Sequence, residues 1–279
     1  MAAILVMTFV VWLLAHKVQG HGRLLEPPSR ASMWRMGFNT PPNYDDNQLF
    51  CGGVKVQYED NGGKCGVCGD PWQGPLEHEP GGKYATGTIV RKYNVNDVML
   101  VVVEITANHR GYVEFRLCPS DDPMAKITQD CLDKYVLKNT TGASRFAVPE
   151  GDYLTRLFIN VTLRIPTGLR CRACMIQWKY NAGNSWGTFP NGTSCVGCGN
   201  QEQFYGCSDI AIGYDDVVLG VTAKPNYVIP DMTTNGVKTN DSMPCEYADI
   251  LGPCHACCTR VHVWLIGAAV LFALRLCVM

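Results

Sequence analysis

The residues with the most distinctive chemistry are histidines, of which the chain has six among 279 residues. One of them, His21, follows a 20-residue N-terminal segment with an apolar run from Ala2 to Ala15 and the small residue Gly20 at its end. This pattern is typical of a cleaved signal peptide. The alternative, an uncleaved membrane anchor, is disfavoured because the run is short for spanning a bilayer. We therefore expect His21 to be the first residue of the mature chain.

An N-terminal histidine offers a metal ion two nitrogen ligands from one residue, the α-amine and the imidazole Nδ1. The α-amine has an ordinary pKa near 8, so binding must displace a proton, which a strongly Lewis-acidic metal does readily. One more imidazole would complete a T-shaped set of three nitrogens, and a planar nitrogen set favours Cu(II). The processed terminus therefore predicts a site for one copper ion.

His109 is the best candidate for the second imidazole. It lies between two predicted strands, Val98–Thr106 and Tyr112–Cys118, and a short loop held between strands positions a ligand rigidly. Taken alone, His109 would be interpreted as a surface turn residue; a processed His21 reverses that preference. The other histidines of the mature chain lie in a long loop-like stretch or close to the C-terminal tail: His78, His255 and His262.

The elements that must position these histidines are mainly strands. β-branched and alternating runs predict further strands at Leu157–Ile165, Cys171–Tyr180 and Asp209–Val221, with turn-rich segments between them. We expect an all-β fold, an antiparallel β-sandwich of the immunoglobulin or fibronectin-III type, with no helix in its body apart from short turns. The stretch from His21 to about Val95 is loop-like and must be stapled by cross-links.

Cysteines supply those cross-links. Ten lie between residues 51 and 207, and in an exported domain they predict up to five disulfides rather than zinc sites at the C-x-x-C pairs. These cysteines are Cys51, Cys65, Cys68, Cys118, Cys131, Cys171, Cys174, Cys195, Cys198 and Cys207. Four N-glycosylation sequons also suit the secretory pathway; they begin at Asn139, Asn160, Asn191 and Asn240.

Composition predicts four segments: the signal peptide 1–20, a domain over 21–222, a polar stalk over 223–253 and an apolar tail over 254–279. A small residue, a polar spacer and an apolar end are typical of a GPI-attachment signal, and Gly252 suits the attachment site. A C-terminal membrane segment or a buried helix is the alternative. We expect a secreted or extracellular protein held at the outer cell surface by this tail.

Charge limits the class of partner. The chain has 24 basic and 25 acidic residues, a formal net charge of −1, with no basic run. Nucleic-acid binding needs a basic surface, so a nucleic-acid partner is not expected.

Several motifs in one order resemble the lytic polysaccharide monooxygenases, and among them auxiliary-activity family fifteen of invertebrates, formerly described as chitin-binding type-4 domains. The motifs are HGRLLEPPSRASMWRMGF at the mature terminus, NYDDNQLFCGG, GKCGVCGDPW, ANHRGYVEFRLC and NQEQFYGCSDIAI. The resemblance covers about residues 21–222. It implies a histidine brace in which His21 binds copper through amine and side chain, and His109 through its imidazole.

The resemblance also implies roles near the copper. An aromatic residue on a late strand occupies the axial side, and QEQFYGC places Phe204 there; Tyr205 must face the other way because adjacent strand residues alternate. Ala107 resembles the small residue that shapes the opposite axial side. Gln177 is a candidate hydrogen-bonder to bound oxygen, or equally a solvent-facing strand residue.

The implied reaction is oxidative cleavage of a crystalline polysaccharide with O2 or H2O2 and an external reductant. Hydrolysis would need two paired carboxylates, which the sequence does not establish. Chitin is the expected substrate and cellulose the second, with Trp34, Tyr44 and Trp72 as candidate sugar-stacking residues on a flat face of a monomer. The alternatives are a binding module that grips chitin without oxidising it and a structural cell-surface protein.

Overall fold

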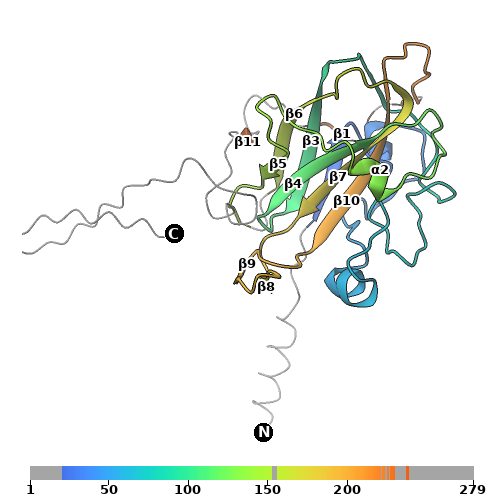
Figure 1. Cartoon of the computed structure of the whole chain (residues 1–279). Helices are drawn as coiled ribbons and strands as arrows, with labels where there is room; N and C mark the ends of the chain where they lie inside the picture. Colours follow the sequence, from blue (N-terminus) through green and yellow to red (C-terminus); the bar gives the residue numbers. More distant parts are fainter. Residues whose placement is uncertain are drawn as a thin grey trace, which may run out of the picture. The chain divides into compact units, whose positions relative to one another are not determined.

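Two β-sheets packed face to face enclose the apolar core (Figure 1). The computed structural model describes residues 21–152, 156–220, 222–223, 225, 227–229 and 237–238. The first sheet contains, in spatial order, β1 (His21–Glu26), β3 (Val98–Ala107), β6 (Leu157–Arg164) and β11 (Val237–Lys238). The second contains β2 (Arg91–Tyr93), β10 (Gln203–Ile212), β7 (Cys171–Asn181), β4 (Tyr112–Cys118) and β5 (Arg145–Ala147). The predicted immunoglobulin-like sandwich is confirmed.

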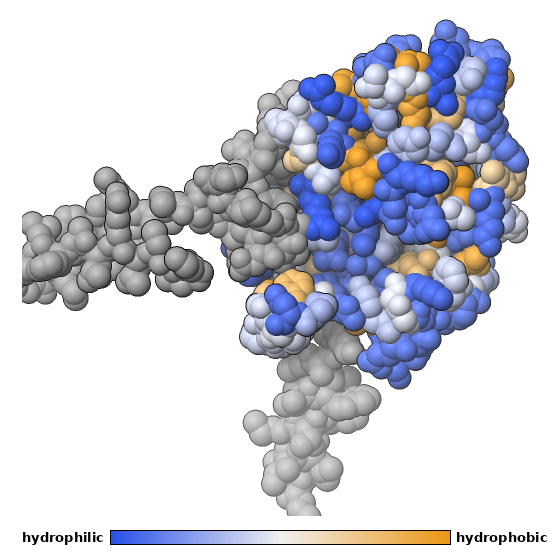
Figure 2. Space-filling model, viewed as in Figure 1, coloured by the Kyte–Doolittle hydropathy of each residue, from blue (hydrophilic) through white to orange (hydrophobic). Residues whose placement is uncertain are grey.

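A separate hairpin of β8 (Trp186–Thr188) and β9 (Ser194–Val196) follows β7. Alternation along the strands builds the core between the sheets, because successive side chains point to opposite faces. From β3, Val103 and Ile105 are fully buried, and β7 contributes Ile176 and Trp178. The surface in Figure 2 is largely hydrophilic with scattered apolar residues, as expected when the apolar faces of both sheets are turned inward.

The prediction of a wholly irregular stretch from His21 to Val95 was wrong at both ends. It begins with β1, which pairs antiparallel with β3, and ends with β2, which pairs parallel with β10. Between them lie a 3-10 turn, η1 (Met33–Met36), and a π-helical turn, η2 (Lys55–Asp60).

The remainder of this stretch covers the outer face of the second sheet. A disulfide joins Cys68 to Cys207 of β10, and Arg30 forms a buried ion pair with Asp209 at 2.7 Å. The β10 strand is therefore buried on both faces, which removes the alternation of polar and apolar residues that marks a half-exposed strand. For this reason the predicted strand, 209–221, was wrong in its bounds: β10 spans 203–212.

Three further expectations need correction. The sandwich is not purely antiparallel, because β2 and β11 pair parallel to their neighbours. The body contains one four-residue helix, α2 (Gln129–Leu132), capped by the Thr128 hydroxyl, which accepts from the Cys131 N–H. Part of the predicted stalk packs on the domain: β11 pairs with β6, and the Tyr227 hydroxyl donates to Glu104 of β3 at 3.1 Å.

All ten cysteines between residues 51 and 207 form disulfides, which confirms the predicted framework. Two C-x-x-C pairs close on themselves, Cys171–Cys174 and Cys195–Cys198, while the third is divided between two bridges. The remaining bridges are Cys51–Cys65, Cys68–Cys207 and Cys118–Cys131. Every thiol in this set is engaged, so these cysteines cannot act as zinc ligands.

The sequons differ in accessibility. Asn191 is exposed at the turn between β8 and β9, and Asn160 is half-buried on β6. Asn139 is only 6% exposed, and its side-chain carbonyl accepts hydrogen bonds from Thr141 and Ala143, so the folded chain presents it poorly as a glycan acceptor. Asn240 lies outside the described residues, as do the signal peptide and the apolar tail. No helix within the described ranges has the length and hydrophobicity needed to cross a bilayer.

Candidate copper site

The β1–β3 ladder brings the two predicted histidine ligands together. His21 is the first residue of β1 and pairs with Ala107, the last residue of β3. His109 follows Ala107 by two residues, so 88 residues of sequence separation are closed by one strand pair. The expected neighbour Ala107 therefore lies directly opposite His21 in the sheet.

Backbone hydrogen bonds hold the His109 loop in place. The His109 N–H donates to the Tyr180 hydroxyl oxygen at 2.9 Å, and the His109 carbonyl accepts from Gly183 N–H at 2.8 Å. On the other side, the Asn108 amide donates to the Pro149 carbonyl at 2.8 Å. Hydrogen bonds thus fix both His109 and the preceding Asn108, which gives the ligand the rigidity that a metal site needs.

The electrostatic environment keeps His109 neutral. Burial and, to a smaller extent, the nearby charge of His21 together lower the pKa of His109 to about 4. An imidazole with this pKa carries no extra proton near neutral pH, so its ring nitrogen is free to act as a metal ligand. The pairing of His21 with Ala107 places both histidines at the same end of the β1–β3 ladder.

Phe204, not Tyr205, is the aromatic residue beside His21. The ring centroids of Phe204 and His21 are 6.1 Å apart, and Phe204 stacks between Tyr180 and Phe50. Tyr205 points to the opposite face, where its hydroxyl donates to Gln203 at 2.7 Å. Phenylalanine supplies no ligand atom, so it can only fill space and exclude water there.

Comparisons with known proteins agree with this geometry. A family model described as "lytic polysaccharide mono-oxygenase, cellulose-degrading" matches residues 21–210. The chain belongs to the lytic polysaccharide monooxygenases. A solved structure of the lytic polysaccharide monooxygenase AA15 from Thermobia domestica in the Cu(I) state is 44% identical, with a TM-score of 0.65, and the match covers 69% of this chain and 98% of that chain. A search of curated proteins found no match.

This monooxygenase is a copper-dependent enzyme that cleaves polysaccharides oxidatively, and it belongs with auxiliary-activity family fifteen. The donor set suits copper: one imidazole at the start of β1 and one in the loop after β3, the second held neutral by burial, beside a ring that offers no competing ligand. Nitrogen donors of this kind favour Cu(II) over the harder cations. The residues present therefore fit the metal.

The interpretation of Gln177 as a hydrogen-bonder near the copper was wrong. Gln177 and Tyr180 are three positions apart on β7, so they face opposite sides of the sheet. The Gln177 amide donates to the Val67 carbonyl at 2.7 Å and to Gln129 at 2.9 Å, beneath the long N-terminal segment. These hydrogen bonds tie β7 to the segment that covers it.

The three predicted sugar-stacking residues fall in different places. Tyr44 is 76% exposed, three residues before Asn47, whose carbonyl accepts from Gly22 N–H next to His21. Trp34 is half-buried and supports Tyr44, with the ring centroids 5.2 Å apart and edge to face. Trp72 is 50% exposed, near Lys64 in the Cys51–Cys65 region.

Trp186 was missed by sequence reasoning. It is 70% exposed at the start of β8, paired with the half-exposed Val196, and only three residues after Gly183, which bonds the His109 loop. The sequence predicts turn-rich segments at 181–188 and 192–199, and the two strands there were missed because each has only three residues. The sequence feature that could have identified it is a tryptophan in a polar loop closed by a disulfide, where an apolar side chain has no core to pack against and is expected to be exposed.

Proposed function

We propose that the mature enzyme begins at His21 and binds one copper ion through the His21 α-amine, the His21 imidazole and the His109 imidazole. The pairing of His21 with Ala107, which sets the chain end beside the His109 loop, is the observation that carries this proposal. The family match also begins at His21. Removal of residues 1–20 would then create the site, because it frees the amine that is the third ligand.

Copper supplies the one-electron chemistry that activates O2 or H2O2 with electrons from an external donor. The protein's contribution is geometric. Backbone bonds to Tyr180 and Gly183 fix His109, burial keeps its imidazole unprotonated, and Phe204 closes one side of the site against water. A site at a chain terminus at the edge of a sandwich suits a crystalline substrate, which cannot enter a pocket.

We propose chitin as the substrate. Tyr44 and Trp186 are large, exposed aromatic residues that suit stacking on sugar rings. Tyr44 is three residues before Asn47, which bonds Gly22, and Trp186 is three residues after Gly183, which bonds His109. Resemblance to the invertebrate branch favours chitin. Cellulose is the second candidate because the matching family model carries that description.

The decisive experiment uses protein that starts at His21, loaded with one equivalent of copper and incubated with ascorbate on chitin and on cellulose in parallel. Mass spectrometry of soluble products should detect oxidised oligosaccharides from chitin. Two matched controls are His109→Ala and protein with one alanine added before His21; both should lose the products. Products only from cellulose would overturn the substrate, and products that survive the added alanine would overturn the brace.

We further propose that the enzyme is exported as a monomer, glycosylated at Asn191 and held at the outer cell surface through its tail. The exposed position of Asn191 and the disulfide framework support export. Expression in eukaryotic cells, followed by phosphatidylinositol-specific phospholipase C, tests the form of attachment. Release into the medium would indicate a GPI anchor, and retention would indicate a membrane segment.

A further inference from the structure

A β-bulge lies between the two histidines in the β1–β3 ladder. His21 pairs with Ala107 whereas Gly22 pairs with Ile105, so Thr106 is an extra residue on β3. Bulges increase the local twist, re-aim side chains and occur frequently next to active sites. Thr106 is three residues before His109, so this bulge adjoins both ligands.

The His21 side chain points in a direction that a regular strand without the bulge would not give it. Arg23 points outward to Glu104, with an ion pair at 3.0 Å, while a Cβ on Gly22 would meet Trp178 in the core. Strict alternation would send the His21 side chain outward with Arg23. Its ring instead lies 6.1 Å from Phe204 of the opposite sheet. The bulge falls between His21 and Gly22, the point at which the alternation is broken.

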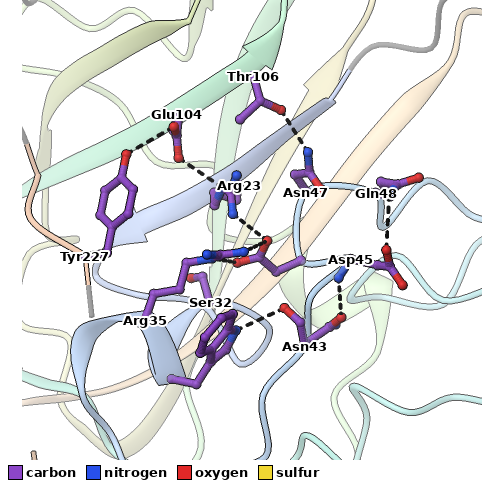
Figure 3. Close-up of polar contacts among 12 residues, drawn as sticks. Arg23, Ser32, Arg35, Asn43, Asp45, Asn47, Gln48, Glu104, Thr106 and Tyr227 are labelled. Atoms are coloured by element: carbon purple, nitrogen blue, oxygen red, sulfur yellow. Dashed lines mark hydrogen bonds and ion pairs between the residues drawn. The ribbon is translucent and has the colours of Figure 1, made fainter. Parts of the chain in front are cut away.

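Asn47 bonds both strands at this bulge. Its backbone carbonyl accepts from Gly22 N–H at 3.1 Å, and its side-chain amide donates to the Thr106 hydroxyl oxygen at 2.9 Å. Figure 3 shows the amide reaching from its loop to Thr106 on β3. Asn47 thus joins Gly22, the residue after His21 in β1, to Thr106, the extra residue of β3.

The loop that carries Asn47 is itself held firmly. Asp46, only 2% exposed, forms ion pairs with Arg23 Nη1 and with Arg35 Nε, both at 2.5 Å. Asp45 N–H donates to the Asn43 side-chain carbonyl at 3.0 Å, which closes the turn before it. A buried carboxylate between two guanidiniums is costly to disrupt, so the Asn47 amide is presented in a fixed position.

We propose that Asn47 is a positioning residue for the copper site, which fixes the bulge at Thr106 and thereby sets the direction of His21 relative to His109. Asn47 does not itself contact the metal. The inference rests on the proposed function, since it concerns the geometry of the brace.

The test uses protein beginning at His21 in four variants: Asn47→Ala, Thr106→Val, their combination, and Thr106→Ser, which retains the hydroxyl. Gln48→Ala is the matched control, because within the described part of the chain the Gln48 side chain bonds to Asp45 of the same loop and to neither strand. Copper affinity is measured by calorimetric titration, the site geometry by the Cu(II) EPR spectrum, and folding by melting temperature.

Loss of one hydrogen bond should weaken copper binding by roughly two- to tenfold and shift the EPR spectrum. The double variant should be no weaker than the weaker single variant, because both remove the same bond. Thr106→Ser and Gln48→Ala should match the wild type in affinity and spectrum. If Asn47→Ala does not fold, Thr106→Val alone decides.

Two failures are distinguishable. If wild-type protein with a free His21 does not bind copper, the proposed function fails. If the wild type binds, but Asn47→Ala and Thr106→Val lower only the melting temperature and leave affinity and spectrum unchanged, Asn47 is merely structural and this inference is overturned.

Discussion

Replacing Phe204 by alanine probes the ring beside His21. Phe204 is 1% exposed and has three aromatic neighbours, with centroids at 6.1 Å for His21 and Phe50 and 5.7 Å for Tyr180. Truncating a buried phenylalanine costs about 3–5 kcal/mol, which includes its aromatic contacts. In a domain of this size each kcal/mol lowers Tm by about 2–4 °C, so we expect a fall of roughly 6–20 °C.

The same variant should change the copper site, because the cavity left by the ring admits water next to His21. Calorimetry measures the stability loss, and the Cu(II) EPR spectrum of protein beginning at His21 measures the change at the metal. Tyr205→Phe is the matched control: it keeps the ring and loses the hydroxyl, whose hydrogen bond to Gln203 on the opposite face is worth about 0.5–1.5 kcal/mol. A changed spectrum in Tyr205→Phe with an unchanged one in Phe204→Ala would refute the assignment.

Three other predictions concern the scaffold and the substrate face. Asp209→Ala leaves the buried Arg30 guanidinium without its counter-ion and should cost about 3–5 kcal/mol in chemical denaturation. The double variant with Arg30→Met and Asp209→Leu should cost much less, and equal costs would contradict this explanation. Burial alone would raise the pKa of Glu114, but Lys179 and two arginines outweigh it and hold that pKa below its ordinary value of 4.5. The stability that this carboxylate contributes is therefore present above pH 4.5 and is lost as the pH falls through the lowered pKa. The Tm difference between wild type and Glu114→Gln should shrink in that range. A constant difference from pH 3 to 8 would argue against the ion pairs. Trp186→Ala should weaken binding to insoluble chitin severalfold in a pull-down assay and leave copper affinity unchanged, whereas loss of copper binding would show that the hairpin supports the metal site instead.

Local sequence patterns were enough to predict a copper enzyme and the two histidines proposed to bind the metal. A signal-peptide pattern ending at Gly20 predicts that His21 is terminal, and a histidine between two strong strand signals predicts His109 as its partner. These inferences need only local composition and ordinary ligand chemistry. The ten cysteines likewise predicted a cross-linked exported domain, although their pairing, such as Cys68 with Cys207 across 139 residues, did not follow from spacing.

Which side chains share a face could not be predicted before the packing of the chain was known. Gln177 looked available for the copper until the long N-terminal segment was seen to cover that side of β7. The same segment buries both faces of β10, so the strand shows no alternation of polar and apolar residues. Alternation alone therefore could not predict that Phe204 faces His21. Asn47 and Thr106 are 59 residues apart and carry no shared motif. Their contact exists because β1, a six-residue strand without a strong local signal, finds its partner in β3, and long-range pairing of this kind is set by packing rather than by propensity.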